Sequence, residues 1–102
     1  MSNQNTALER QSDAVASLRR DVGLWLRDER KRAGYSQTDL AKKLGLDYYT
    51  FISQIENGRG RIPSSRYADW ADALNLSRRE FALRMVKYYD PHTYELITGT
   101  DD

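Results

Sequence analysis

The sequence predicts an all-α domain, and three kinds of observation carry that prediction. Apolar residues recur at intervals of three and four over most of the chain, which is the spacing of one helix face. Residues that cap helices, such as Ser36 and Ser77, precede several of these segments, and glycines such as Gly34, Gly45 and Gly58 follow them. At 102 residues the chain can bury one modest core and so forms one domain.

Composition argues against several classes of function. The chain has no cysteine, which excludes disulfides and thiol catalysis. It has a single histidine, His92, which argues against a metal site, and we expect no other cofactor. Its acids are spread over predicted helix surfaces without the close titratable groups that acid–base catalysis needs, so we do not expect an enzyme. No apolar run could span a bilayer and the polar start lacks a secretion signal, so we expect a cytoplasmic protein without membrane partners.

The N-terminal quarter is predicted to be a tail followed by a helix. Residues 1 to about 11 are polar without periodicity, which indicates a mobile tail. Ser12 or Asp13 could cap the helix that follows. Its apolar face repeats at three- and four-residue steps, through Val15, Leu18, Val22 and Leu26.

Gly23 interrupts this pattern. A glycine inside a helix costs about 1 kcal/mol relative to alanine, so we expect a break near residues 21–23, although one long helix to Ala33 would also fit. Gly34 should end the helix and Tyr35 should pack beside the next one. A basic run is expected on the outward side of this helix, at Arg27, Arg30, Lys31 and Arg32.

Residues 36–57 predict two short helices joined by a sharp turn. Ser36 is a good cap for a helix over residues 37–44, and Gly45 suits the left-handed position that follows it. Asp47 can cap a second helix. The buried side of that helix should hold Tyr48, Phe51 or Ile52, and Ile55, and its outer side Tyr49, Thr50, Ser53, Gln54 and Asn57. Such an arrangement is a helix-turn-helix.

The outer side of the second helix is polar but uncharged. No charged residue lies between Tyr48 and Ile55, although charged residues make up 30% of the chain. Amides and hydroxyls can read base edges in a major groove, whereas burial against another helix or subunit is the alternative. We favour groove binding. Residues 18–66, which include this motif, carry a net charge of +5, as a phosphate-facing side requires, although solvated basic residues are the commoner case.

The segments VGLWLRDERKRAGYSQTDLAKKLG, FISQIENGRGRIPS and ADWADALNL resemble the phage-repressor family of helix-turn-helix proteins, of the Cro/cI or xenobiotic-response-element type. The resemblance runs from Val22 to about Met85. It implies a five-helix, lambda-repressor-like all-α domain over residues 21–89 whose third helix reads DNA. An N-terminal tail and helical extension (1–20) and a short C-terminal helix and tail (90–102) would flank it.

One departure from the family pattern lies in the turn. The family has six steps from the turn glycine to the first buried aliphatic residue of the recognition helix, and Gly45 to Ile52 is seven. The extra residue lies in the LDYYT segment. Which of Tyr48, Tyr49 and Thr50 takes the base-reading positions at the helix start therefore stays open.

The resemblance and the residue types together give a set of candidate DNA contacts. Base-reading residues in a recognition helix at about 48–57 would be Tyr48, Tyr49, Thr50, Ser53 and Gln54. Phosphate-binding residues would be Ser36, Gln37, Asn57, Arg59 and Arg61. The resemblance also implies that Gln37 braces the recognition helix and that Glu56 faces inward and pairs with an arginine or an amide.

The C-terminal third predicts further helices. Pro63 with Ser64 and Ser65 should open one whose core face is Tyr67, Trp70, Ala71 and Leu74. Leu76 should continue the core through a short turn. Ser77 and Glu80 read as a capping box for the next helix, with Phe81, Met85 and Val86 inward. Asp90 and Pro91 should start a short helix through Ile97, halted by Gly99, and residues 100–102 should fray.

These expectations favour a dimeric, sequence-specific regulator of transcription, most simply a repressor at the nucleoid, with double-stranded DNA as its partner. A tyrosine-rich C-terminal segment, with Tyr88, Tyr89, Tyr94, Leu96 and Ile97, has surplus apolar area that could form the dimer contact or fold back on the first helix. The same segment could hold another protein. An antitoxin whose helix-turn-helix represses its own operon is therefore the alternative function.

Overall fold

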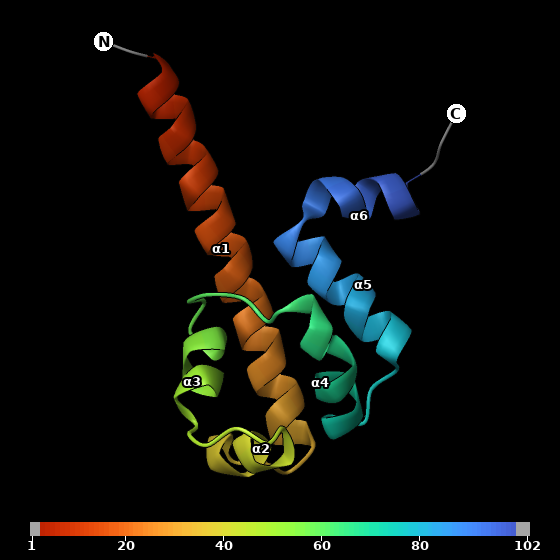
Figure 1. Ribbon diagram of the computed structural model, residues 1–102. Coiled ribbons are helices and arrows are strands. Elements are labelled where there is room, and N and C mark those ends of the chain that lie inside the picture. Colours follow the sequence, from red (N-terminus) through yellow and green to blue (C-terminus); the bar gives the residue numbers. More distant parts are fainter. Residues whose placement is uncertain (1–2, 100–102) are drawn as a thin grey trace.

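The computed structural model describes the backbone of residues 3–99 and the side chains of residues 9–99 (Figure 1). This part of the chain is helical and contains no strand, as predicted. The elements in order are α1 (Asn3–Arg32), α2 (Gln37–Lys43), α3 (Thr50–Glu56), the 3₁₀ turn η1 (Ser64–Arg66), α4 (Tyr67–Ala73), α5 (Arg78–Tyr89) and α6 (Pro91–Thr98).

Helix α1 is a single helix of 30 residues, and this corrects two expectations. The chain is already helical from Asn3, so the tail expected to about residue 11 is wrong for the described residues, and there is no break at residues 21–23. Gly23 serves a different purpose, because a Cβ built on it would lie 2.5 Å from the Glu56 carbonyl oxygen and 2.7 Å from that of Ile55. The missing side chain lets α1 pass directly over the end of α3.

Local signals end the first four α-helices in the same way. In each, a residue just past the helix has positive φ and the next N–H donates back to a carbonyl five residues earlier, which is a Schellman motif. The predicted stops Gly45 (φ 71°) and Gly58 (φ 81°) both show it, with Leu46 N donating to Ala41 O and Arg59 N to Gln54 O at 2.8 Å. Gly34 was also predicted, whereas Asn75 (φ 59°) was not.

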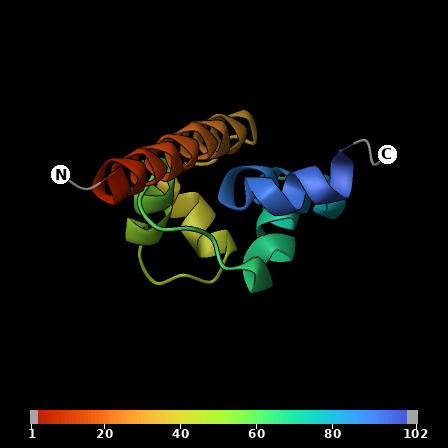
Figure 2. The same ribbon diagram turned by 90° about the horizontal axis from the view of Figure 1, so that it is seen from above.

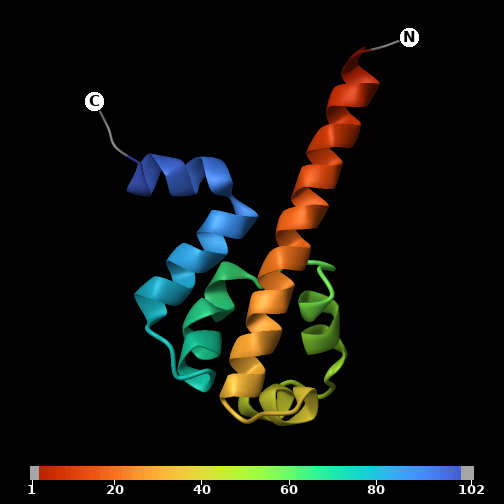
Figure 3. The same ribbon diagram turned by 180° about the vertical axis from the view of Figure 1, so that it is seen from behind.

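The core lies where α1, α3, α4 and α5 meet. Helix α1 packs against α3 and α5, and α4 packs against α5 (Figures 1 and 3). Trp70 was expected in the core and is buried there, as are Val22 and Leu26. The buried apolar residues also include Leu40, Ala41, Leu44, Ile52, Ile55, Ile62, Ala71, Leu74, Phe81 and Met85. Val86 lies at the margin, only partly buried.

In the second half the predicted caps Ser77 and Asp90 are present, but Ser77 and Glu80 form only one of the two hydrogen bonds of a capping box. The helix expected to open after Pro63 begins with the 3₁₀ turn η1, and α4 starts at Tyr67 without a side-chain cap. Ser77 Oγ accepts a hydrogen bond from Glu80 N–H at 3.2 Å at the start of α5. Asp90 caps α6 by accepting from Thr93 N–H at 3.2 Å, with Pro91 as the first helical residue. Hydrogen bonds from the side chain and backbone of Thr93 lower the pKa of the Asp90 carboxyl. The expected fraying of residues 100–102 lies outside the described residues.

The molecule has two distinct ends. At one end lie α2 and the turn into α3, and at the other lie the loop between α3 and α4, the N-terminal half of α1, and α6 (Figures 1 and 3). Seen from above, α1 and α6 lie on opposite sides of that second end (Figure 2). None of the described helices is apolar enough over a sufficient length to cross a membrane.

Candidate nucleic-acid interface

The start of α2 is fixed by a capping box. Asp39 N–H donates to Ser36 Oγ, and Ser36 N–H donates to Asp39 Oδ2, both at 3.0 Å. The hydrogen bonds from Ser36 hold the pKa of the Asp39 carboxyl below its usual value. Ser36 is therefore engaged in capping, and it places Gln37 as the first residue of α2.

Helix α3 presents one uncharged polar face. Thr50 and Gln54 are exposed, Ser53 is half-buried and Asn57 caps the helix end, and this i, i+3, i+4, i+7 spacing places them together. The opposite face, with Ile52 and Ile55, is fully buried in the core. The helix lies at the edge of the molecule in Figures 1 and 3, and no other helix of the described residues lies over its outer side.

The recognition helix begins later than expected. Asp47 does not cap it, because the first helical residue is Thr50 and the capping position is Tyr49, which makes no side-chain cap hydrogen bond. Tyr48 is not on the buried face either, since it is 78% exposed and precedes the helix, and Tyr49 is 52% exposed. The extra residue of the turn thus places two exposed tyrosines directly before α3, beside Thr50.

Glu56 ties three helices together beneath this face. Its carboxylate accepts from Arg30 Nε at 2.6 Å and Nη2 at 3.0 Å, and from Gln37 Nε2 at 3.1 Å. The inward orientation of Glu56 and its pairing with an arginine and an amide are as predicted, and so is the brace from Gln37. Arg30 was expected on the outward side of α1, which is wrong, because it is buried in this ion pair and also donates to Tyr35 O at 2.8 Å.

The loop after α3 carries the candidate phosphate ligands. Arg59 and Arg61 are both exposed, and the Arg61 guanidinium carbon lies 4.8 Å from the centroid of the Tyr89 ring. Stacking uses the flat face of the guanidinium and leaves its N–H donors available at the edge. Tyr89 Oη in turn accepts from Ile62 N–H at 3.2 Å, and burial raises the pKa of this phenol.

Two residues that hold this surface were missed by the sequence analysis as specific contacts. Arg27 had been placed only within a general basic run, yet its Nη2 donates to Asn57 Oδ1 at 3.2 Å and so steadies the end of α3. Tyr89 had been counted as surplus apolar area, yet it anchors the loop. Neither role had a local sequence signal, because each contact joins residues far apart in the chain.

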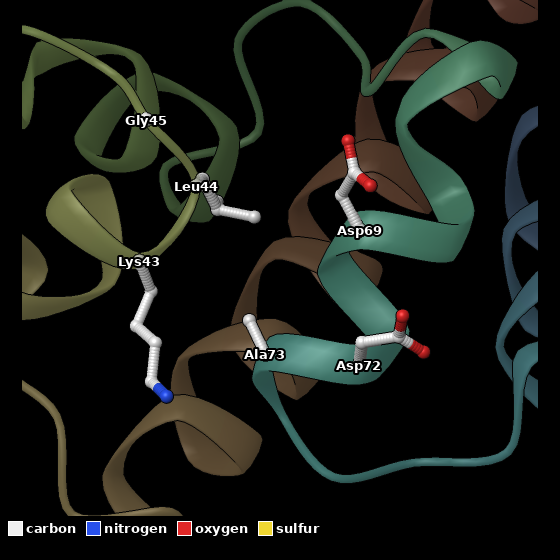
Figure 4. A pocket seen from close by; sticks show the side chains of 6 residues that line it. All are labelled: Lys43, Leu44, Gly45, Asp69, Asp72 and Ala73. Carbon is white, nitrogen blue, oxygen red and sulfur yellow. The ribbon is translucent and has the colours of Figure 1, made fainter.

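A hollow near α2 does not form a second site. It measures about 470 Å³, is open to solvent, and lies between Lys43 on α2 and the acids Asp69 and Asp72 on α4 (Figure 4). Asp72 is paired with Arg78 at 2.6 Å, which lowers its pKa, and Asp69 lies 3.8 Å from Arg66. In the described part of the chain no cluster of histidine and carboxylate side chains could hold a metal ion.

Comparison with known proteins agrees with this geometry. The helix-turn-helix family profile matches residues 26–81, which is more than half of the chain. The chain is also 29% identical, over 79 residues, to the "ImmF control region 10 kDa protein" of Bacillus phage phi105, covering 78% of this chain and 87% of that protein. The matched region spans the capped α2, the exposed α3 and the core that supports them. The chain therefore belongs to the phage-repressor-like helix-turn-helix family of DNA-binding regulators.

Proposed function

We propose that this protein is a sequence-specific repressor of transcription that binds an inverted-repeat operator as a homodimer. The observation that carries the proposal is the outer face of α3, which is exposed, polar and without charge, and which is flanked by exposed arginines. Neutral amides and hydroxyls suit the floor of a major groove, and arginines suit the phosphates on either side.

The roles divide by position. Thr50, Ser53 and Gln54 read base edges, and Gln54, whose amide can donate and accept in a bidentate pair, is suited to an adenine. The exposed Tyr48 and Tyr49 extend this reading surface at the start of the helix. The phosphate ligands are Ser36 and Gln37 at the start of α2, and Asn57, Arg59 and Arg61 at and after the end of α3.

A homodimer would place two such helices in successive major grooves. Two-fold symmetry sets the half-sites about 34 Å apart, one turn of the duplex, and this spacing is why the operator would be an inverted repeat. Occupying such an operator within a promoter excludes polymerase. The protein would act in the cytoplasm, on the nucleoid.

The division between base and phosphate contacts is tested with one pair of variants. Gln54→Ala should weaken binding to the operator by about 1 to 3 kcal/mol, at one base position, and leave binding to random duplex unchanged. Arg59→Ala should weaken binding to both duplexes and reduce the slope of log K against log salt by about one. Fluorescence anisotropy with operator and random duplexes at several salt concentrations measures both effects.

Arg79→Ala, at an exposed position of α5, is the matched control and should change neither quantity. Equal losses on operator and random duplex from Gln54→Ala would contradict its role in base reading. Full-length protein that binds no duplex at low ionic strength would overturn the proposed function as a whole.

A second candidate function is a protein-binding module, such as an antitoxin that represses its own operon. The exposed Leu96 and Ile97 on α6 favour it, because apolar side chains at 85% and 60% exposure suit a partner surface. Tyr88 and Tyr89 contribute less than expected, since both pack against the core. Co-purification with the product of a neighbouring gene would support this candidate, and a homodimer that binds DNA alone would count against it.

A further inference from the structure

Apart from Leu24 and the two tyrosines before α3, the large apolar side chains that are exposed in the described residues lie on two surfaces at the same end of the molecule. Val15 on α1 is 47% exposed, and Leu96 and Ile97 on α6 are exposed more fully. The N-terminal half of α1 and the whole of α6 extend beyond the loop between α3 and α4, away from α2 (Figures 1 and 3). A two-fold contact at this end would bring both surfaces of each chain into one interface.

The surface on α1 is a continuation of the core. Val15, Leu18, Val22 and Leu26 form one stripe, of which the last two are buried, Leu18 is half-buried and Val15 is exposed. The main neighbours of α1 are α3 and α5, whereas α6 packs on α5. A helix segment of this length is marginal in water unless its apolar side is covered. A partner that covers the exposed part of the stripe would therefore stabilise the N-terminal half of α1.

The charges beside the two surfaces are of opposite sign. At about 100° per residue Arg19 borders the α1 stripe, while Glu9 and Asp13 lie on the far side of that helix. Helix α6 with its cap carries Asp90 and Glu95 and contains no lysine or arginine. Lys87 of α5 lies 5.9 Å from the Tyr94 ring, and Arg61 and His92 lie near Asp90, so Glu95, next to Leu96 in the chain, is the acid on which the charge argument depends. Pairing α6 with α6 would bring like charges together, whereas pairing α6 with the α1 stripe joins opposite ones.

We propose that the occupant of each surface is a second copy of this chain, bound reciprocally. Leu96 and Ile97 of one chain pack on Val15 and Leu18 of the other, and Glu95 lies beside Arg19. Each pair of surfaces is used twice about the two-fold axis, so the interface closes at a dimer. The inference deepens the dimeric DNA binding proposed above and rests on it for its role.

Disulfide trapping tests this arrangement, because the chain has no cysteine of its own. Val15→Cys and Ile97→Cys are made on full-length chains with tags of different size, mixed, and oxidised. The mixed dimer of the two variants should exceed either same-variant dimer by at least about fivefold, since only the reciprocal contact joins α1 to α6. Lys43→Cys, on exposed α2 at the opposite end, is the control and should give no excess with Ile97→Cys.

The double variant, with both substitutions on one chain, separates this contact from its alternative. If α6 folds on its own α1, that chain runs as an oxidised monomer, and the proposal is overturned. Dominant dimers of Val15→Cys with itself or of Ile97→Cys with itself, or no dimer at all, overturn it as well. A monomer that instead retains a different protein through α6 during purification has the same consequence.

Charge reversal gives a readout that does not depend on cysteines. Arg19→Glu and Glu95→Arg should each raise the dimer dissociation constant about two- to tenfold in sedimentation equilibrium, and the double reversal should restore it. Absence of rescue would contradict the pairing. Unaltered circular dichroism shows that each variant is folded. If the charge-reversal variants still bind a half-site duplex, their DNA-binding face is intact. Loss of the dimer interface and loss of DNA binding therefore give different results.

Discussion

Glu56 shows how much of the DNA-binding surface depends on one buried side chain. This residue is 2% exposed, and its carboxylate accepts hydrogen bonds from α1 and α2 while belonging to α3. A buried pair of this kind contributes little net stability compared with apolar residues of equal size, but removing one partner leaves an uncompensated charge. Its value here is positional, since it holds the first turn of α2 and the last turn of α3 at a fixed separation.

Glu56→Ala should lower the free energy of unfolding by about 3 to 5 kcal/mol, because Arg30 would then be a buried charge without its carboxylate. Urea denaturation followed by circular dichroism measures the loss. Arg79→Ala should leave the unfolding free energy within error of the parent. A loss no greater for Glu56→Ala than for this control would mean that water or another group solvates Arg30.

The same residue marks what a sequence can and cannot predict at this scale. The family resemblance implied the inward orientation of Glu56 and the brace from Gln37, and the structure confirms both. It did not select which arginine on α1 is the partner. Arg30 is the buried partner, and Arg27 Nε also lies 3.7 Å from Glu56 Oε1, whereas Arg32 is exposed. Only the direction in which each side chain leaves α1 separates these arginines, and composition does not contain it.

At the scale of elements, the ends of helices were the most predictable features. Caps and Schellman stops involve residues close together in the chain, so their signals are local and readable. The start of α3 was predicted wrongly because Asp47 is a suitable cap in isolation. In the structure the first helical residue is Thr50 and Tyr49 takes the cap position, while Ile52 and Ile55 lie on the buried face as the helical spacing predicted.

The cap of α2 should make stability depend on pH. The pKa of Asp39 is lowered in the fold by hydrogen bonds from Ser36, so its carboxylate stabilises the folded protein above its unfolded value of 3.8 and ceases to do so as pH falls through the folded value. The difference in unfolding free energy between the parent and Asp39→Ala should therefore shrink as the pH is lowered from about 6 to about 3. Urea titrations at several pH values measure it.

Thr38→Ala, in the same turn and without a titratable group, is the control for this pH series. The difference in unfolding free energy between Thr38→Ala and the parent should stay constant with pH. If the difference in unfolding free energy between Asp39→Ala and the parent is equally constant with pH, the capping box contributes no charged interaction.

For the whole molecule, the decisive contact is the one between α1 and α3 at Gly23. The sequence suggested a break there, since glycine disfavours a helix interior, whereas the structure shows a continuous helix that uses the missing side chain for close approach. The difference arises from tertiary packing, which no local propensity contains. Gly58 repeats the pattern from the other side, with a built Cβ only 2.8 Å from Arg20 Cγ.

Gly23→Ala should destabilise the protein even though alanine is the better helix former. Propensity would favour the change by about 1 kcal/mol, but the new Cβ meets two backbone carbonyls that cannot rotate away, and we expect a net loss of about 1 to 3 kcal/mol. Thermal unfolding measures it. Ser17→Ala, at an exposed site on the same helix, should be neutral or stabilising, and a similar result for Gly23→Ala would refute the close contact.

This contact also has a mechanical consequence. Helix α1 has 30 residues and is about 45 Å long, and it contacts the end of α3 at Gly23. The part of α1 before Gly23, its outer arm, is longer than the part after it. A partner bound to that outer arm would act on the end of α3 through the close contact at Gly23. For the operator binding proposed above, this contact predicts that a partner bound to the N-terminal turns of α1 alters the position of α3 without a cavity for an effector.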